Sequence, residues 1–171
     1  MHADDLRALQ APLKARYRDD PAAALVTLRA QGTLGAGVGC SVQTGRALVE
    51  AGLHPATGGT GLAACSGDML LEALVACAGV TLAAVATAIG VTLRHGTVHA
   101  EGDLDFRGTL GVAKEAPVGL QHVRLRFALD TDATDEQLAT LLRLTERYCV
   151  VFQTLRQPPA MTVTCHREDR A

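Results

Sequence analysis

Five cysteines are the residues of this chain whose side chains could do covalent chemistry, and their spacing limits what that chemistry is. No two are separated by only two residues, and no spacing is that of a zinc finger. In a reducing compartment, cysteines scattered in this way suit free or redox-active thiols better than a disulfide framework. The five are Cys40, Cys65, Cys77, Cys149 and Cys165.

Two of these thiols lie in apolar segments long enough to be helices. Cys77 lies near the middle of residues 70–89, a run with a single charge at Glu72, and Cys149 belongs to an apolar stripe with helical spacing that begins at Leu138. One buried cysteine is usually a small hydrophobic residue. Two cysteines on two such segments favour a reactive pair. We interpret the other three cysteines as structural. Cys65 is the least certain of these, because it is close enough along the chain to reach the Cys77 site.

Metal and nucleotide chemistry have weaker support. His95, His99 and Glu101 fall on one strand face and Cys165 precedes His166, but that face is otherwise solvated, which indicates surface histidines. The chain has no HExxH motif, no phosphate-binding glycine motif and no Ser-His-Asp order. We therefore expect neither a metal nor a cofactor.

The composition indicates one domain over residues 1–171 with no nucleic-acid partner. The chain has 171 residues and a formal net charge of −2, which argues against a nucleic-acid or polybasic membrane surface. Residues 1–20 are polar and of mixed charge rather than leader-like, so we expect a cytoplasmic protein. Residues 1–22 are expected to form an N-terminal extension that is helical.

The cysteines must be positioned by a mixture of helices and strands. Ser66 is expected to cap a helix that starts near Asp68 and stops at Gly90, and the sequence TDEQ, 134–137, predicts a capping box for a second helix that continues past Cys149. The expected strands are 24–32, 38–45 and 46–52 as an antiparallel meander, two strands of alternating pattern at about 95–106 and 121–130 joined by a long loop, and a last strand at 160–166.

The two alternating strands predict a pairing with charged partners. Acidic side chains alternate with apolar ones in the first strand, and basic ones do so in the second. Antiparallel pairing would place opposite charges across from each other, with each pair stabilising the sheet by a few tenths of a kcal/mol to about 1 kcal/mol.

The run at 70–89 is long enough to span a bilayer, yet a buried helix explains it better. It is rich in alanine, few basic residues flank it, and the rest of the chain has the pattern of soluble strands. A helix that is apolar on all sides must be covered on all sides. One sheet covers only one side, so we expect the second helix or a second copy of the chain to cover the other, as in an obligate homodimer.

The two cysteine segments resemble those of the OsmC/Ohr family, the osmotically inducible and organic hydroperoxide resistance proteins. The stretch SGDMLLEALVACAGVTL, 66–82, is similar to the first cysteine helix of the family, and ERYCVVFQTL, 146–155, is similar to the second. The resemblance covers roughly residues 24–166, including the order of strands and helices. It implies an α+β OsmC-like fold, with antiparallel sheets around two cysteine-bearing helices, in an intertwined homodimer with its active site at the subunit interface.

The same resemblance implies a thiol peroxidase that reduces organic hydroperoxides. Cys77 would be the peroxidatic cysteine and Cys149 the resolving one, closing an intramolecular disulfide that an external dithiol or thiol reductant reopens. Asp68 stands where the family has a glutamate that orients an arginine, and either Arg29 or Arg46 would be that arginine. Because a thiolate is the nucleophile and a free thiol is mostly protonated at neutral pH, a nearby cation matters to this hypothesis.

A non-catalytic OsmC-like dimer is the alternative. Such a protein would bind a hydrophobic small molecule at its interface or be purely structural. The feature that favours it is the loop TLGAG, 33–37, which has no arginine where active members carry one.

Overall fold

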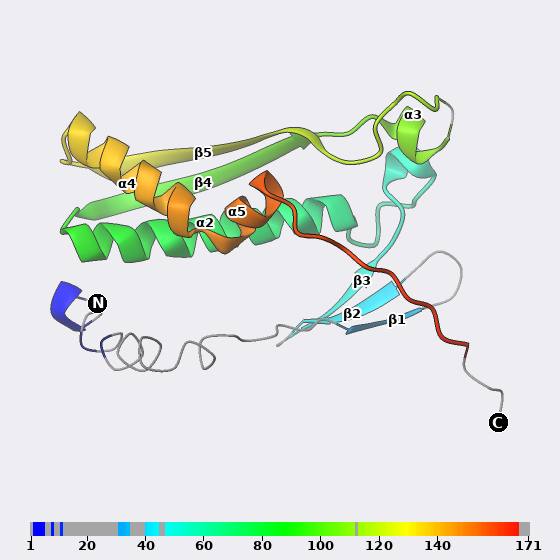
Figure 1. Ribbon diagram of the computed structural model, residues 1–171, viewed down its shortest axis with the longest axis horizontal. Helices are drawn as coiled ribbons and strands as arrows, with labels where there is room; N and C mark the ends of the chain where they lie inside the picture. The colour runs from blue at the N-terminus through cyan, green and yellow to red at the C-terminus, as the bar shows by residue number, and fades with distance from the viewer. Residues whose placement is uncertain are drawn as a thin grey trace.

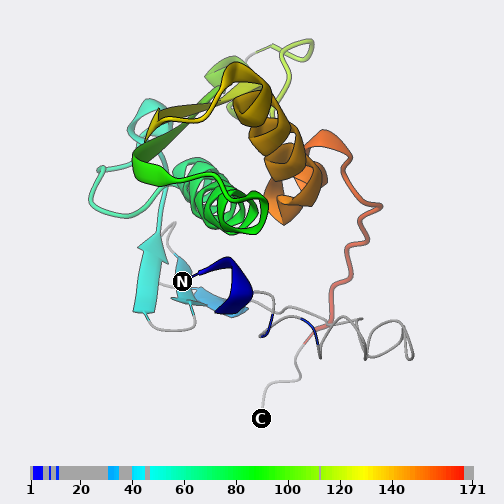
Figure 2. The same cartoon turned by 90° about the vertical axis from the view of Figure 1, so that its left-hand side faces the viewer.

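A computed structural model describes residues 2–5, 8, 11, 31–34, 40–44, 47–111 and 113–167 of the chain. Its long helix α2 (Ser66–Ile89) lies between two antiparallel sheets, and two further helices pack beside it (Figures 1 and 2). The other elements are β1 (Gln31–Leu34), β2 (Cys40–Thr44), β3 (Ala47–Ala51), a short 3-10 helix (Pro55–Thr57), β4 (Leu93–Asp103), α3 (Phe106–Thr109), β5 (Gln121–Thr131), α4 (Asp135–Tyr148) and α5 (Val150–Arg156).

The strands β1, β2 and β3 form the expected antiparallel meander. Gly32 pairs with Val42, and Val42 pairs in turn with Val49 on β3. The described part of the first strand begins at Gln31, and the expected residues 24–30 lie outside the described residues, as does most of the N-terminal extension 1–22, of which residues 3–5 are helical. After β3, a backbone hydrogen bond of 3.0 Å from Gly52 to Ala64 leads the chain into α2.

The expected helix is present over Ser66–Ile89, but Ser66 is not its cap. Cys65 has the extended backbone of an N-cap residue, makes no side-chain capping hydrogen bond, and leaves Ser66 as the first helical residue. The other end is as expected, because Gly90 has a φ of 74° and donates its N–H to the carbonyls of Ala86 and Thr87. This left-handed conformation is one that glycine adopts without a Cβ penalty.

The strands β4 and β5 confirm the predicted faces and charge pairing. The apolar side chains of Val98, Ala100, Leu125, Phe127 and Leu129 point toward the helices, and the charged ones point outward. Arg124 pairs with Asp103 at 2.6 Å and Glu101 at 3.1 Å, and Arg126 reaches Glu101 at 3.3 Å. Leu104 and Phe106, assigned to the first strand by the alternation, lie beyond its end at Asp103.

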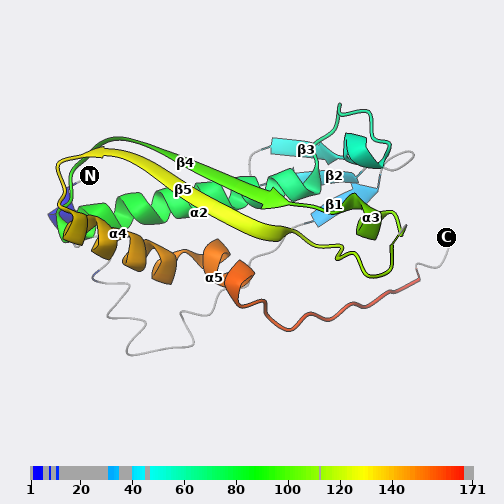
Figure 3. The same ribbon diagram turned by 90° about the horizontal axis from the view of Figure 1, so that it is seen from above.

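The loop before α2 and the expected long loop between β4 and β5 each contain a short helical turn. Pro55–Thr57 is a 3-10 helix whose N-cap His54 accepts the Ala56 N–H on Nδ1. The connection between β4 and β5 contains α3, and the rings of His54 and Phe106 stack with centroids 4.8 Å apart. This stack ties the loop before α2 to the loop before β5. Figure 3 shows the short helical turns of these two loops beside each other.

The second helix is broken where one continuous helix was expected. Thr134 and Gln137 form the predicted capping box, which confirms the start of α4. At Cys149, however, the backbone turns extended (φ −73°, ψ 107°), so this residue is both the C-cap of α4 and the N-cap of α5. The β-branched Val150 and Val151 follow directly, and such residues support a continuous helix less well than straight-chain ones.

The core lies between α2, the inner face of β4 and β5, and the pair α4 and α5. Leu82, Val85, Ala86 and Leu141 are buried at one end of this layer, and Leu74, Ala78 and Cys149 at the other. Only 28% of the most apolar stretch of α2, which is long and apolar enough to cross a membrane, is buried within the chain.

The expected last strand is absent from the single chain. Residues 158–167 run away from α5 without regular structure, and every side chain among them is exposed, including Met161 and Val163 (Figure 3). The alternation of apolar and polar residues is present in AMTVTCH, but no neighbouring strand in the described part of this chain lies alongside it to complete a ladder.

Candidate functional site

Cys77 and Cys149 come together at the centre of the molecule. Cys77 lies midway along α2 and is half-buried, whereas Cys149, between α4 and α5, is only 1% exposed. Both thiols are free, and both belong to one apolar cluster with Leu74 and Ala78 from α2 and Phe152 from α5. The fold therefore brings two cysteines that are 72 positions apart in sequence (149 minus 77) into contact.

The environment of Cys77 favours its thiolate. Burial alone acts to raise the pKa of this thiol, but four hydrogen bonds outweigh it and hold the pKa below its ordinary value. The donors are the backbone N–H of Val151, the Cys149 thiol, the backbone N–H of Val150 and the Thr81 hydroxyl. The break at Cys149 frees the two N–H groups from helical hydrogen bonding, since the first N–H groups of a helix have no partner within it.

The environment of Cys149 favours its neutral thiol. Burial is the largest influence and raises the pKa of Cys149. The backbone N–H groups of Phe152 and Val151 act to lower this pKa, but the neighbouring Cys77 sulfur raises it, and the net shift is upward. The Cys149 S–H consequently donates to the Cys77 sulfur. The pair is thus asymmetric, with a more accessible thiol inclined to lose its proton and a buried thiol inclined to keep it.

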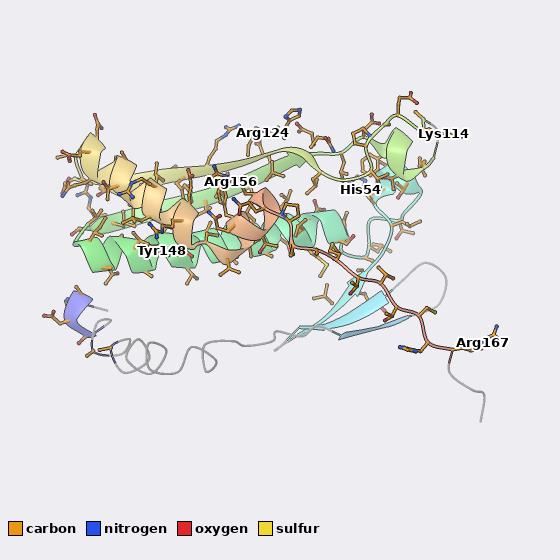
Figure 4. The ribbon with its side chains drawn as sticks, in the orientation of Figure 1. His54, Lys114, Arg124, Tyr148, Arg156 and Arg167 are labelled. Carbon is orange, nitrogen blue, oxygen red and sulfur yellow. The ribbon has the colours of Figure 1, made fainter. Side chains whose placement is uncertain are left out.

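Asp68 does not join this pair within one chain. It lies nine positions before Cys77 on the same helix, which is half a rotation around it and about 14 Å along its axis. Its exposed side chain instead lines a cavity of about 170 Å³ together with Cys65 and His54. Of these residues, His54 is labelled in Figure 4. Arg29 and Arg46, the two candidate arginines, lie outside the described residues.

The remaining cysteines are separate from the pair. Cys65 is twelve positions before Cys77, roughly 18 Å along α2, so it does not reach that thiol. Cys165 is exposed on the C-terminal segment, and the side chain of Cys40 lies outside the described part. Among the described residues, no three His, Cys, Asp or Glu side chains are grouped to hold a metal ion, and His95 and His99 are exposed on β4.

A mostly apolar cavity of about 450 Å³ lies beside the thiol cluster. Leu70 and Leu74 of α2 line it on one side, Phe152 and Leu155 of α5 on another, and two residues of β5 close a third. Leu74 is buried in the same cluster as Cys149, and Phe152 and Leu155 pack against that cluster, as Cys77 does. The one charged residue in its lining is Arg156, labelled at the end of α5 in Figure 4.

Sequence reasoning did not find the groups that act on Cys77. Thr81 had a usable signal, because a residue four positions after Cys77 lies on the same side of a helix one turn on. The N–H groups of Val150 and Val151 had none, since every residue carries one and only the break at Cys149 makes them available.

Comparisons with known proteins agree with this architecture. Residues 59–164, more than half of the 171 in the chain, match the family model described as OsmC-like protein. No curated protein matches the chain.

Solved structures from the same group share the fold at low sequence identity. The OsmC-like protein from Mycoplasma pneumoniae superimposes with a TM-score of 0.64 at 15% identity, over 78% of this chain and 89% of that one. An organic hydroperoxide resistance protein from Elizabethkingia anophelis, with thiocyanate bound, gives 0.63 at 19% identity over 78% and 91%.

A third structure was solved with a small molecule in place. It is a putative organic hydroperoxide resistance protein from Vibrio cholerae with captopril bound in one of its active sites, and it gives 0.53 at 21% identity over 78% and 88%. The OsmC/Ohr resemblance and the α+β fold are confirmed, and the chain belongs to the OsmC-like family.

Proposed function

We propose that this protein is a cysteine-based peroxidase that reduces organic hydroperoxides, with Cys77 as the peroxidatic and Cys149 as the resolving thiol. The contact between the two thiols is the observation that carries the proposal. The lowered pKa of Cys77 suits a nucleophile, and the raised pKa of Cys149 keeps its proton available until Cys77 has reacted. The organic hydroperoxide resistance proteins among the similar structures support the same class of substrate.

The chemistry needs only the two thiols, the peroxide and an external reductant. The Cys77 thiolate attacks one peroxide oxygen, the O–O bond breaks, and the leaving alkoxide takes a proton to become an alcohol. Cys77 is then a sulfenic acid. The Cys149 sulfur attacks the Cys77 sulfur, the S–O bond breaks, and the hydroxyl leaves as water with the Cys149 proton. An external dithiol reduces the resulting disulfide and is itself oxidised to a disulfide.

The working form in this proposal is a cytoplasmic homodimer. The residues Ala73, Ala76, Val80 and Ala83 make an exposed stripe along α2 at helical spacing, and Val80 is 73% exposed in the single chain. Monomeric soluble proteins rarely leave such a patch uncovered. A second copy would cover the stripe and would offer its own Asp68 and arginine-bearing segment to the Cys77 site.

A non-catalytic binding protein is the second candidate. The groups described around Cys77 are backbone N–H groups, a thiol and a hydroxyl, and the described contacts include no arginine. The apolar cavity beside the cluster is within the size range of small-molecule sites. A protein of this kind would bind a hydrophobic ligand and leave its thiols unchanged.

Disulfide mapping after one equivalent of cumene hydroperoxide separates the two candidates. The reduced full chain is treated, digested without reductant and analysed by mass spectrometry beside Cys77→Ser, Cys149→Ser and the control Cys165→Ser. We expect a Cys77–Cys149 disulfide within seconds in the parent and in the control, no reaction in Cys77→Ser, and a trapped sulfenic acid in Cys149→Ser.

The opposite result is equally clear. If all five thiols stay reduced, or oxidise at equal slow rates, the peroxidase proposal is wrong and the binding candidate takes its place.

A further inference from the structure

His54 contributes to the loop before α2 through its backbone and its ring separately. Its carbonyl accepts three hydrogen bonds, from the backbone N–H groups of Thr57 at 2.8 Å and Gly59 at 3.1 Å and from the Thr57 hydroxyl at 2.9 Å. Its ring Nδ1 accepts the N–H of Ala56 at 3.0 Å, which caps the 3-10 helix Pro55–Thr57. The backbone of His54 is therefore held without the ring, and only the cap depends on the state of the imidazole.

The cap determines which nitrogen of the ring carries a proton. A backbone N–H can only donate, so Nδ1 must present a lone pair to Ala56, and the single ring proton of the neutral imidazole lies on Nε2. A protonated imidazole carries hydrogens on both nitrogens and cannot accept a hydrogen bond at either. Neutral His54 therefore caps the helix, and protonated His54 does not.

The cavity beside His54 contains an acceptor for a charged ring. The titratable side chains that line it with His54 are Cys65 and Asp68, both at the start of α2, and Asp105 does not line it. Asp68 makes no hydrogen bond or ion pair with another described residue. A cavity of about 170 Å³ holds several water molecules, so the ring can engage the carboxylate directly or through a water. The walls from β4, α3 and the approach to β5 carry no charge and comprise Gly102, Leu104, Phe106 and Leu120.

Phe106 supports the imidazole in either state. The two rings stack with their centroids 4.8 Å apart and their planes at 20°. Rotating the imidazole by half a turn about its Cβ–Cγ bond keeps the ring in the same plane, so the stack is retained while Nδ1 turns away from Ala56. The face of a phenyl ring also attracts a cation, so a protonated imidazole keeps this support.

We propose that His54 is a pH-sensitive switch, with Ala56 as the partner of its neutral ring and Asp68 as the partner of its protonated ring. At higher pH, His54 caps the 3-10 helix and leaves the Asp68 carboxylate unengaged. At lower pH, the ring turns on Phe106, releases the Ala56 N–H and binds Asp68. In the proposed homodimer that carboxylate is offered to the second copy, so acid would draw it back to its own chain. This last consequence rests on the proposed function, whereas the switch itself does not.

NMR of the reduced, isotope-labelled full chain tests the switch through the ring nitrogens of His54 and the amide of Ala56. Histidine is the side chain whose ordinary charge change falls within the range from about pH 8 to about pH 5.5, so these two conditions are compared. At the higher pH we expect a proton on Nε2 only and a protected Ala56 amide. At the lower pH we expect protons on both nitrogens and an Ala56 exchange rate, relative to its intrinsic rate, that is roughly five- to ten-fold faster, as the loss of one hydrogen bond allows.

Three variants isolate the two partners. His54→Asn keeps an acceptor in place, because asparagine Oδ1 is bonded to Cγ as histidine Nδ1 is, and it does not titrate, so Ala56 should stay protected at both pH values. Asp68→Asn removes the partner of the charged ring and should move the change in Ala56 exchange to lower pH. Glu72→Gln, one turn further along α2 and outside the lining of this cavity, should leave that change where it is in the parent.

A proton on Nδ1 at the higher pH, equal Ala56 exchange at the two pH values, or a change that persists in His54→Asn would overturn the switch. An Asp68→Asn protein that behaves like Glu72→Gln would overturn the pairing with Asp68. None of these results bears on whether Cys77 and Cys149 react with cumene hydroperoxide, and unreactive thiols would leave the switch in place.

Discussion

At the scale of single residues, Cys77 and Cys149 lie in one apolar cluster, yet the pKa of Cys77 is lowered and the pKa of Cys149 is raised. Both lose solvation, yet Cys77 gains donors from Val150, Val151 and Thr81, while Cys149 gains the charge of its neighbour. If the two thiols had the same environment, the first negative charge to form would be divided equally between the two sulfur atoms. Here the more accessible sulfur has the lowered pKa, so the member of the pair that ionises more readily is also the one that an incoming electrophile reaches first.

Thr81→Val should slow the reaction of Cys77 by moving its titration to higher pH. The thiolate is present above the pKa of Cys77, which hydrogen bonds hold low, and removing the Thr81 donor raises that pKa. At neutral pH a smaller fraction of Cys77 is then ionised. We expect a roughly two- to ten-fold lower alkylation rate, in line with the loss of one hydrogen bond, measured by iodoacetamide labelling of the Cys77 peptide across a pH series.

Thr87→Val is the matched control on the same helix. The Thr87 hydroxyl donates to the Ala83 carbonyl at 2.8 Å and is ten positions from Cys77, so its loss should leave the pH profile unchanged. Identical profiles for Thr81→Val and the parent would show that the hydroxyl does not act on Cys77.

The sequence contained enough to find the two thiols but not what tunes them. Both cysteines stood out because each lies on an apolar segment, and that is a property of residue type and spacing. The N–H groups of Val150 and Val151 are free to donate only because the helix breaks at Cys149, and no residue type in the sequence predicts that break. Arg29 and Arg46, the two candidates for an activating arginine, lie outside the described residues, so that role stays a prediction.

At the scale of elements, the sequence predicted a helix or strand correctly where the hydrogen bonds of that element are formed by residues within it or within its one neighbouring strand. The capping box of α4 uses only Thr134 and Gln137, and the alternation on β4 and β5 is resolved within one pair of strands. The last strand at 160–166 was wrong for the single chain because a strand needs a neighbour. The expected continuous second helix was wrong because two β-branched residues after Cys149 accompany a break that apolar spacing alone does not reveal.

Thr134→Ala should destabilise the fold by about 1 kcal/mol through the loss of the α4 cap. The Thr134 side chain accepts the Gln137 N–H at 3.3 Å, and alanine would leave that N–H without its partner. The free energy of unfolding from urea titration measures the change. Thr162→Ala, in the exposed C-terminal segment, should stay within about 0.5 kcal/mol of the parent, and equal losses in the two variants would rule out a specific role for the cap.

At the scale of the whole molecule, α2 has more apolar surface than the described part of one chain covers. The β4–β5 sheet and the helices α4 and α5 shield one side, and the β1–β3 sheet lies beyond the N-terminal part of the other (Figures 1 and 2). Residues 59–164, which match the OsmC-like family model, include the whole of this helix. In the proposed homodimer, a second copy of the chain covers the remaining stripe.

Val80→Lys should convert the proposed homodimer to a monomer. Val80 is 73% exposed in one chain, so a lysine there costs that chain little, but burying its charge against a second α2 would be costly. Light scattering coupled to size exclusion gives the mass directly. Ala128→Lys, on the outward charged face of β5, should remain dimeric, and a Val80→Lys protein that also stays dimeric would place the interface elsewhere.

The break at Cys149 also ends the hydrogen-bond ladder of α4 before that of α5 begins. α4 is closed by its own cap hydrogen bonds at both ends, so Val150–Arg156 can open by local unfolding while Asp135–Tyr148 stays folded. Such an opening would uncover the Cys149 sulfur and part of the cavity wall together, at a smaller cost than global unfolding. A reductant too large to enter the closed core would therefore gain access to a disulfide there through a transient, localised fluctuation of seven residues.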